Sequence, residues 1–351
     1  MSETLIEQFV NDAGPILVLD IGSGTQDVLL ALPKVNPENW PKFVLPSPER
    51  RLSKAIAKAT NAHENIFLFG ENMGGGFSQA LRKHLAQGFK VFATKEAALA
   101  IHDDLERVKA LGVEICSRAP KDAWPLHLTD YAPDAWRTFL QSLGLPNPRI
   151  VLTSAQDHGF SKLGNRKFRM QIWQDLLEAD PNPANWITQN PRPELTRLAT
   201  LQRAHAGFVA DTGISALLAF LADPNILDRS YQLGLTLLNV GNTHTLAALV
   251  YQGKVCALYE HHTVLLTPEI LAHDLEEFRL GWLPAEQVQL ASGHGTVYGL
   301  RPEEAEGFAP TYITGPLRKP YLHLGQAVNP AGDMMVAGCF GLLWGIAQQN
   351  L

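Results

Sequence analysis

The feature that most constrains the fold is a short polar turn between two apolar runs near the start of the chain. Residues 16–20 form an apolar run that ends in Asp20, and Gly22-Ser23-Gly24-Thr25 separates it from a second apolar run at 28–32. Pro33 stops the second run after five residues, too few for a helix. The pattern therefore predicts a strand, a tight turn and a second strand.

This turn has the chemistry of a phosphate-binding loop. Gly22 and Gly24 allow a tight turn with exposed backbone N–H groups, and the hydroxyls of Ser23 and Thr25 add hydrogen-bond donors. Asp20 is placed to hold Mg²⁺ through water, and Asp27 could support it from the second strand. The plainer alternative is a glycine turn capped by Asp20 with no ligand.

Two other ligands suit glycines that follow a strand. A dinucleotide site has this pattern, and VLDIGSGT also resembles the first motif of methyltransferases that use S-adenosylmethionine. Both require a helix directly after the glycines, which Pro33 interrupts. The hairpin interpretation is therefore favoured.

The second half of the chain repeats the pattern. An apolar run at 235–238 leads into Asn239-Val240-Gly241-Asn242-Thr243, and a strand is expected at 246–251. Asn239, Gly241 and either Thr243 or Thr245 then stand where Asp20, Gly22 and Thr25 stand in the first half. The sequence predicts an α/β protein with an internal duplication, divided into an N-terminal lobe at 1–205 and a C-terminal lobe at 206–351.

The two hairpins resemble the phosphate loops of the superfamily of actin, heat-shock chaperone ATPases and acetate or sugar kinases. Thr314-Gly315-Pro316, after an expected strand at 311–314, is similar to the adenosine loop of that superfamily, and residues 332–339 resemble its closing helix. The resemblance implies two ribonuclease-H-like lobes around an interlobe cleft that binds ATP and Mg²⁺. It implies phosphoryl transfer to a small molecule or ATP hydrolysis.

One residue departs from the superfamily pattern. In many members the second hairpin begins with an Asp that helps to bind the metal or position water, whereas this chain has Asn239. Three functions therefore stay open. They are an ATP-dependent phosphotransferase or hydrolase, a nucleotide-sensing protein with little turnover and a possible protein partner, and a methyltransferase.

A narrower resemblance lies at Gln156-Asp157-His158-Gly159-Phe160, with Arg166 and Arg169 downstream. It is similar to a family labelled as a pyruvate formate-lyase activating enzyme. A radical activase needs a CxxxCxxC cluster, and Cys116, Cys256 and Cys339 are far apart, so that chemistry is not expected.

Several residues outside the hairpins are candidates for substrate contacts. Asp157 and His158 could act as general base and orienting group, and Gln156, Arg166 and Arg169 could contact an anionic substrate. Gly74-Gly75-Gly76 could form an anion nest before a helix at 77–87. The alternatives are an Asp-capped loop with Arg ion pairs, and a plain glycine turn.

Other segments are expected to be structural. A helix is predicted at 95–111, a strand at 288–291, a final helix at 333–348 and surface insertions at 119–149 and 178–197. His261, His262 and His294 are expected in surface or loop roles rather than at a zinc site.

Charge and hydropathy limit the partners. The net charge is −6 without a block of Lys or Arg, so nucleic-acid or membrane binding is not expected. The N-terminus has acids before any apolar run, and no apolar stretch approaches the roughly 20 residues of a membrane span. We expect a cytoplasmic protein.

Overall fold

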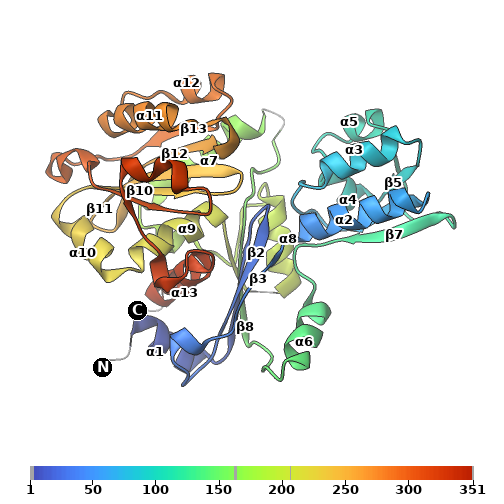
Figure 1. The fold of residues 1–351 in the computed structure, drawn as a ribbon, viewed down its shortest axis with the longest axis horizontal. Helices are drawn as coiled ribbons and strands as arrows, with labels where there is room; N and C mark the ends of the chain where they lie inside the picture. Colours follow the sequence, from blue (N-terminus) through green and yellow to red (C-terminus); the bar gives the residue numbers. More distant parts are fainter. Residues whose placement is uncertain (1–3, 162–163, 206, 350–351) are drawn as a thin grey trace.

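The computed structural model describes residues 4–161, 164–205 and 207–349. Within these residues the strands form three sheets, two of which lie on either side of a pair of central helices (Figure 1). None of the helices in these ranges combines the length and the apolar character that crossing a membrane requires.

The first sheet has the strand order β3-β2-β1-β8-β9. Its strands are β1 (Ile16–Ile21), β2 (Thr25–Ala31), β3 (Lys42–Pro46), β8 (Ile150–Ala155) and β9 (Phe208–Ala210). The first three form an antiparallel meander, and β8 and β9 continue the sheet in parallel with β1. The predicted hairpin is confirmed because β2 begins at Thr25, directly after the glycine turn.

The second sheet repeats this arrangement in the order β13-β12-β11-β10-β14-β15. Its strands are β10 (Leu235–Val240), β11 (His244–Tyr251), β12 (Lys254–His262), β13 (Gly295–Tyr298), β14 (Thr311–Thr314) and β15 (Gln326–Ala327). The first three are again an antiparallel meander, and β14 pairs in parallel with β10 as β8 does with β1. The repeated order confirms the predicted α/β fold of two ribonuclease-H-like lobes.

Two apolar helices join the lobes. Helices α9 (Thr212–Leu221) and α13 (Ala337–Gln349) pack against each other, and a Cβ added at Gly341 would lie 2.2 Å from the Ser215 carbonyl oxygen. Their side chains share one core with residues from β1 and β10. Helix α13 begins at Ala337, four residues after the predicted start.

Further helices surround the two sheets. They are α1 (Leu5–Ala13), α7 (Asn165–Ala179), α8 (Thr196–His205), α10 (Pro224–Gln232), α11 (Pro268–Leu280) and α12 (Ala285–Leu290). Helix α7 comes from the first half of the sequence but packs on β12 and β13 of the second sheet. The strand predicted at 288–291 is wrong, because only Val288 of the α12 residues is buried and Leu290 points into solvent.

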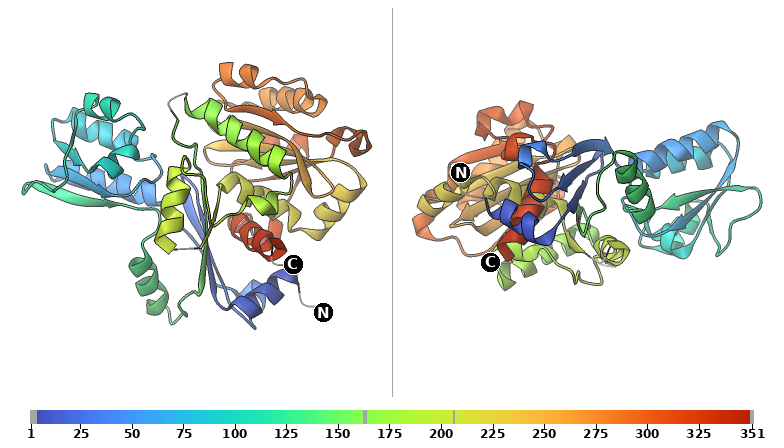
Figure 2. Two further views of the ribbon diagram at one scale, coloured as in Figure 1. Left: turned by 180° about the vertical axis from the view of Figure 1, so that it is seen from behind. Right: turned by 90° about the horizontal axis from the view of Figure 1, so that it is seen from below.

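A third sheet forms a separate small unit with its own core. It consists of the parallel strands β6 (Val113–Ile115), β5 (Val91–Ala93), β4 (Asn65–Gly70) and β7 (Ala123–Leu128), with α2 (Pro48–Asn61), α3 (Ser78–Ala86), α4 (Lys95–Leu99) and α5 (Leu105–Ala110). Figures 1 and 2 show it on the far side of the first sheet from the second lobe, with α6 (Pro133–Ser142) below it.

Two sequence predictions fail in this unit. Residues 119–149 are not only a surface insertion, because β7 pairs with β4 along its length. Pro125 interrupts the apolar pattern of this strand, so the sequence did not indicate it. The sheet tolerates this proline because β7 is an edge strand. The single helix predicted at 95–111 is two helices, since Asp104 caps the start of the second.

The division at residues 205 and 206 stays a prediction. The adjoining strand β9 pairs with β8, and α13 packs on β1 and β2. We therefore propose that the N-terminal lobe extends through residue 210 and is completed by the last helix.

Candidate functional site

A cleft of about 430 Å³ lies between the two lobes and brings most of the predicted site residues together. Its lining includes Asp20, Gly22, Ser23, Thr25, Gly74, Gly75, Gly76, Gln156, Asp157, His158, Arg169, Asn239, Gly241, Asn242, Thr243, Thr314 and Gly315. Gly24, Arg166 and Thr245 are absent from this lining.

The two glycine hairpins meet at one end of the cleft. Ser23 Oγ and Thr243 Oγ1 are 3.2 Å apart, although 220 positions separate them in the chain. A Cβ added at Gly24 would lie 2.8 Å from Asn242 Nδ2, so Gly24 serves the contact between hairpins. The turns from both lobes therefore face the same space.

Backbone pairing corrects the expected match between the hairpins. Gly22 N–H donates to the Thr25 carbonyl at 2.9 Å, and Gly241 N–H donates to the His244 carbonyl at 3.0 Å. His244, rather than Thr243 or Thr245, is thus the counterpart of Thr25. Thr245 is fully buried and its hydroxyl pairs with Thr263 at 3.0 Å, which removes it from the cleft.

Two carboxyl groups of the first hairpin face each other. Asp20 on β1 is the direct cross-strand partner of Asp27 on β2. Asp20 Oδ1 accepts hydrogen bonds from Ser154 at 2.6 Å and Thr212 at 2.7 Å, while burial raises its pKa. Burial, followed by the charge of Asp20, raises the pKa of Asp27 to about 8.

This pair fits a magnesium ion. Asp27 Oδ1 is buried without a hydrogen-bond partner among the described residues, and facing carboxylates repel each other unless a cation or proton compensates them. Mg²⁺ typically takes one or two carboxylates and keeps several waters. The positions of the second hairpin that correspond to Asp20 and Asp27 are Asn239 and Leu246, which face each other across β10 and β11. Of the two hairpins, the first alone offers paired acids at these positions.

The predicted adenosine loop lies against the second hairpin. Gly315 follows β14 with φ of 102°, and a Cβ there would lie 2.3 Å from the Val240 carbonyl oxygen and 2.8 Å from Asn239 Oδ1. Glycine is therefore required on both conformational and steric grounds. The close approach places Thr314 and Gly315 beside the turn that begins at Asn239.

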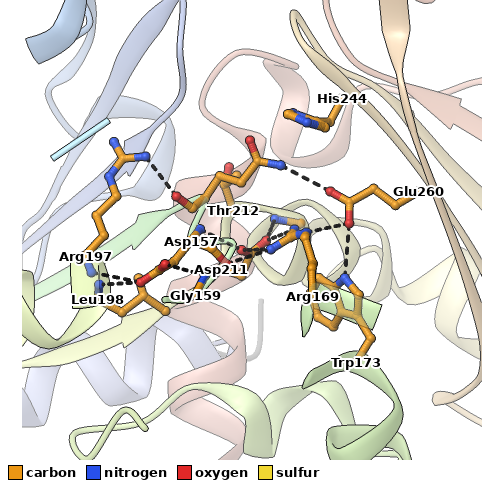
Figure 3. Close-up of polar contacts among 12 residues, drawn as sticks. Asp157, Gly159, Arg169, Trp173, Arg197, Leu198, Asp211, Thr212, His244 and Glu260 are labelled. Atoms are coloured by element: carbon orange, nitrogen blue, oxygen red, sulfur yellow. Dashed lines mark hydrogen bonds and ion pairs between the residues drawn. The ribbon is translucent and has the colours of Figure 1, made fainter. Parts of the chain in front are cut away.

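A buried ion network connects helix α7 to the second sheet and to the start of α9. Arg169 on α7 contacts Glu260 on β12 at 2.5 Å and Asp211, the N-cap of α9, at 2.9 Å (Figure 3). Trp173 Nε1 and Gln156 Nε2 also donate to Glu260, each at 3.1 Å. Burial alone would raise the pKa of Glu260, but the charge of Arg169 lowers it, so the carboxylate is ionised.

This network corrects the roles expected for two residues. Arg169 is only 3% exposed and its charge is matched by two carboxylates, so it is not a free anion clamp. Arg166 is exposed on α7 and is absent from the cleft lining. The structure therefore does not support the predicted Arg clamp, and the alternative of Arg ion pairs describes Arg169.

Asp157 has a structural role. Its Oδ2 accepts the backbone N–H groups of Arg197 at 2.9 Å and Leu198 at 3.1 Å, at the start of α8, and its Oδ1 accepts Gly159 N–H at 2.9 Å. Both oxygens are engaged, so the assignment of Asp157 as general base is not supported. The alternative of an Asp-capped loop describes it.

The Gly74-Gly75-Gly76 turn lines the cleft, but an acid of the chain already occupies it. Gly76 N–H donates to Glu49 Oε2 at 2.6 Å, and a Cβ at Gly74 would lie 2.6 Å from the same oxygen. Glu49 is 5% exposed, and burial raises its pKa. The predicted anion nest is thus filled internally.

Histidines gather beside the second hairpin, which the sequence did not indicate. His294 is only 2% exposed rather than at the surface, and its Nε2 lies 3.1 Å from His244 Nε2. The ring of His158 stacks on His294 with centroids 5.0 Å apart. Burial lowers the pKa of His244 to about 4 and that of His294 to about 3, so both rings are neutral at pH 7.

Sequence reasoning missed Glu260, Thr212 and Ser154 as site residues. Each lies at or near the end of a strand or the start of a helix, but none belongs to a glycine motif. The only available signal was their position beside expected strand ends, which many polar residues share.

Comparison with known families decides the family of the chain. The model of the family described as "Putative pyruvate format-lyase activating enzyme (DUF1786)" matches residues 73–320. The chain belongs to this family. The family match confirms the narrower resemblance, and no curated protein matches the chain. The three cysteines are free and lie in separate parts of the fold, Cys116 after β6, Cys256 on β12 and Cys339 on α13, so they do not form the cysteine cluster of a radical activase.

Solved structures with a similar course of the chain include the "PilM-PilN type IV pilus biogenesis complex", at 11% identity, with a TM-score of 0.37 and coverage of 95% of this chain and 98% of that chain. The ethanolamine utilization protein EutJ from Carboxydothermus hydrogenoformans has 9% identity, a TM-score of 0.29 and 97% coverage of both chains. MreB5 of Spiroplasma citri bound to ADP has 8% identity, a TM-score of 0.30 and coverage of 97% and 99%. The fold assignment rests on the repeated strand order.

Removing the Arg169 charge should destabilise the protein strongly. Arg169→Met leaves Glu260 and Asp211 buried without their cation, and breaking a buried pair costs about 3–5 kcal/mol. Arg192→Ala is the matched control, because Arg192 pairs with Asp175 at an exposed site and should cost at most about 1 kcal/mol. Urea unfolding measures both, and equal losses would contradict the role assigned to Arg169.

Asp27 should make stability depend on pH when divalent cations are absent. Its folded-state pKa of about 8 exceeds the ordinary value of 3.8, so the folded protein holds a proton that the unfolded chain releases. The contribution of Asp27 to the free energy of unfolding therefore falls as pH rises from about 4 to 8. Asp27→Asn should gain stability over the parent protein progressively between pH 5 and 8.

Urea unfolding in EDTA at several pH values measures that difference. Asp12→Asn is the control, because Asp12 is exposed on α1 and should give a difference that does not change with pH. A constant difference for Asp27→Asn as well would contradict the raised pKa.

Proposed function

We propose that the interlobe cleft binds ATP with Mg²⁺ and that lobe closure on the nucleotide is the protein's working step. The observation that carries this proposal is the meeting of two equivalent glycine hairpins, Gly22 to Thr25 and Gly241 to His244, at one end of a single cleft. Exposed backbone N–H groups from two sides suit a polyphosphate. Thr314 and Gly315 would border the adenosine.

The paired acids support a role for magnesium. Asp20 and Asp27 would hold the ion, which when bound would neutralise phosphate charge. Ser154 and Thr212 orient Asp20 through hydrogen bonds to Oδ1. The other oxygen of Asp20 lies against Gly338 at the start of α13, where a Cβ would collide with it. Binding could thus be transmitted to the helix that joins both lobes.

The geometry favours slow turnover. Asp157 is engaged by three backbone N–H groups, and both Glu260 and Asp211 are paired with Arg169. Asn239 adds no charge at the second hairpin. We therefore place nucleotide sensing, with closure presented to a protein partner, ahead of rapid phosphoryl transfer to a small molecule or ATP hydrolysis. The methyltransferase alternative lacks the helix it requires, because β2 follows the glycines directly.

Thermal unfolding with Mg²⁺ and ATP, ADP or S-adenosylmethionine tests the proposal. A ligand at 100 times its dissociation constant adds about 2.7 kcal/mol of stability, so ATP and ADP should raise Tm and S-adenosylmethionine should not. Asp20→Asn and Asp27→Asn should lose most of the nucleotide shift, and Asp12→Asn should keep it.

Phosphate release measured on the same samples separates sensing from catalysis. Binding with slow release supports the sensing role, whereas rapid release would favour the phosphotransferase or hydrolase. Folded protein whose Tm no adenine nucleotide changes would contradict the proposal as a whole. Because Asp27→Asn is expected to be at least as stable as the parent protein near pH 7, loss of its nucleotide shift would not come from misfolding.

A further inference from the structure

Three histidines from both lobes converge at the edge of the cleft. His158 follows β8 of the first sheet, while His244 opens β11 and His294 precedes β13 in the second. One nitrogen from each ring can be chosen so that all three atoms lie within 4.8 Å of one another. His158 and His244 also line the cleft.

The spacing suits a common metal ion. Zinc binds imidazole nitrogen at about 2.0–2.1 Å, so two ligands at tetrahedral angles lie about 3.3–3.4 Å apart. The 3.1 Å between His244 Nε2 and His294 Nε2 is close to that value, and side-chain rotation can bring His158 in. Three protein ligands leave a fourth position open, as in catalytic rather than structural zinc sites.

We propose that His158, His244 and His294 bind one divalent transition-metal ion, with Zn²⁺ as the preferred occupant, and that this ion links the two lobes. The site is separate from the carboxylate pair and takes a different class of cation. Nitrogen ligands favour zinc, copper, nickel or iron over magnesium, which prefers oxygen. The open position would face the cleft, where it could accept water or an oxygen of a bound ligand.

The surroundings support the proposal. His244 Nδ1 lies 3.1 Å from Thr243 Oγ1, so the hydroxyl can fix the orientation of that ring as partners of metal-bound histidines do. After burial, the largest influence on the pKa values of His244 and His294 is the negative charge of Glu260, which favours a nearby cation, and the positive charge of Arg169 partly offsets it. The rings are neutral and their lone pairs are available.

A direct hydrogen bond between His244 and His294 is the competing explanation for their contact. It would use one proton between the two Nε2 atoms and would leave His158 without a role. The two explanations differ in a measurable property, because only the metal site needs all three rings.

Metal titration of the full-length chain without a histidine tag tests the site in the absence of nucleotide. We expect one equivalent of Zn²⁺ by elemental analysis after dialysis, and visible absorption bands of tetrahedral Co²⁺ when cobalt replaces zinc. His158→Gln, His244→Gln and His294→Gln should each weaken binding by more than about 100-fold, since even outer partners of a metal ligand are worth about 10–100-fold.

His262→Gln is the matched control. Its ring lies 4.7 Å from those of both His244 and His294, but it is not one of the three converging ligands. It should bind metal as the parent protein does, and Zn²⁺ should raise Tm in both but not in His158→Gln. Absence of stoichiometric binding, or equal weakening in His262→Gln, would overturn the proposal, whether or not ATP binds.

Discussion

The arrangement of the two lobes depends on the buried charge of Arg169. This residue lies on α7, from the first half of the sequence, yet it is held by Glu260 of the second sheet and by Asp211 at the start of α9. An arginine so deeply buried is tolerated only when its charge is matched and its hydrogen bonds are made. The network therefore fixes how α7, β12 and α9 pack together. Because residues of these elements line the cleft, it also fixes the position of the cleft walls.

From this anchor the arrangement extends to the hairpins through neighbouring residues. Thr212, next to Asp211, donates to Asp20, and Asp20 faces Asp27 across the hairpin. The second hairpin has the same backbone but different chemistry, with Asn239, Leu246 and His244 at the corresponding positions. The two hairpins thus share one backbone arrangement, but the first presents paired carboxyl groups and the second presents an imidazole.

The sequence predicted the parts of the fold that local patterns encode. Glycine turns between apolar runs identified both hairpins, and their repetition identified the duplicated sheets. It did not predict β7, the edge strand of the third sheet, because Pro125 interrupts the apolar pattern of that strand. It also did not show that Asp157 caps α8 or that Arg169 is neutralised, since those partners are distant in sequence. The histidine cluster was hidden for the same reason, because three separate elements supply it.

We propose that one polyphosphate lies between the two hairpins. A crystal structure of the protein with Mg²⁺ and a non-hydrolysable ATP analogue tests it most directly. We predict phosphate oxygens within hydrogen-bonding distance of backbone N–H groups of both Gly22 to Thr25 and Gly241 to His244, with the metal next to Asp20 and Asp27. A nucleotide bound outside this cleft, or phosphates that contact neither hairpin, would contradict the account.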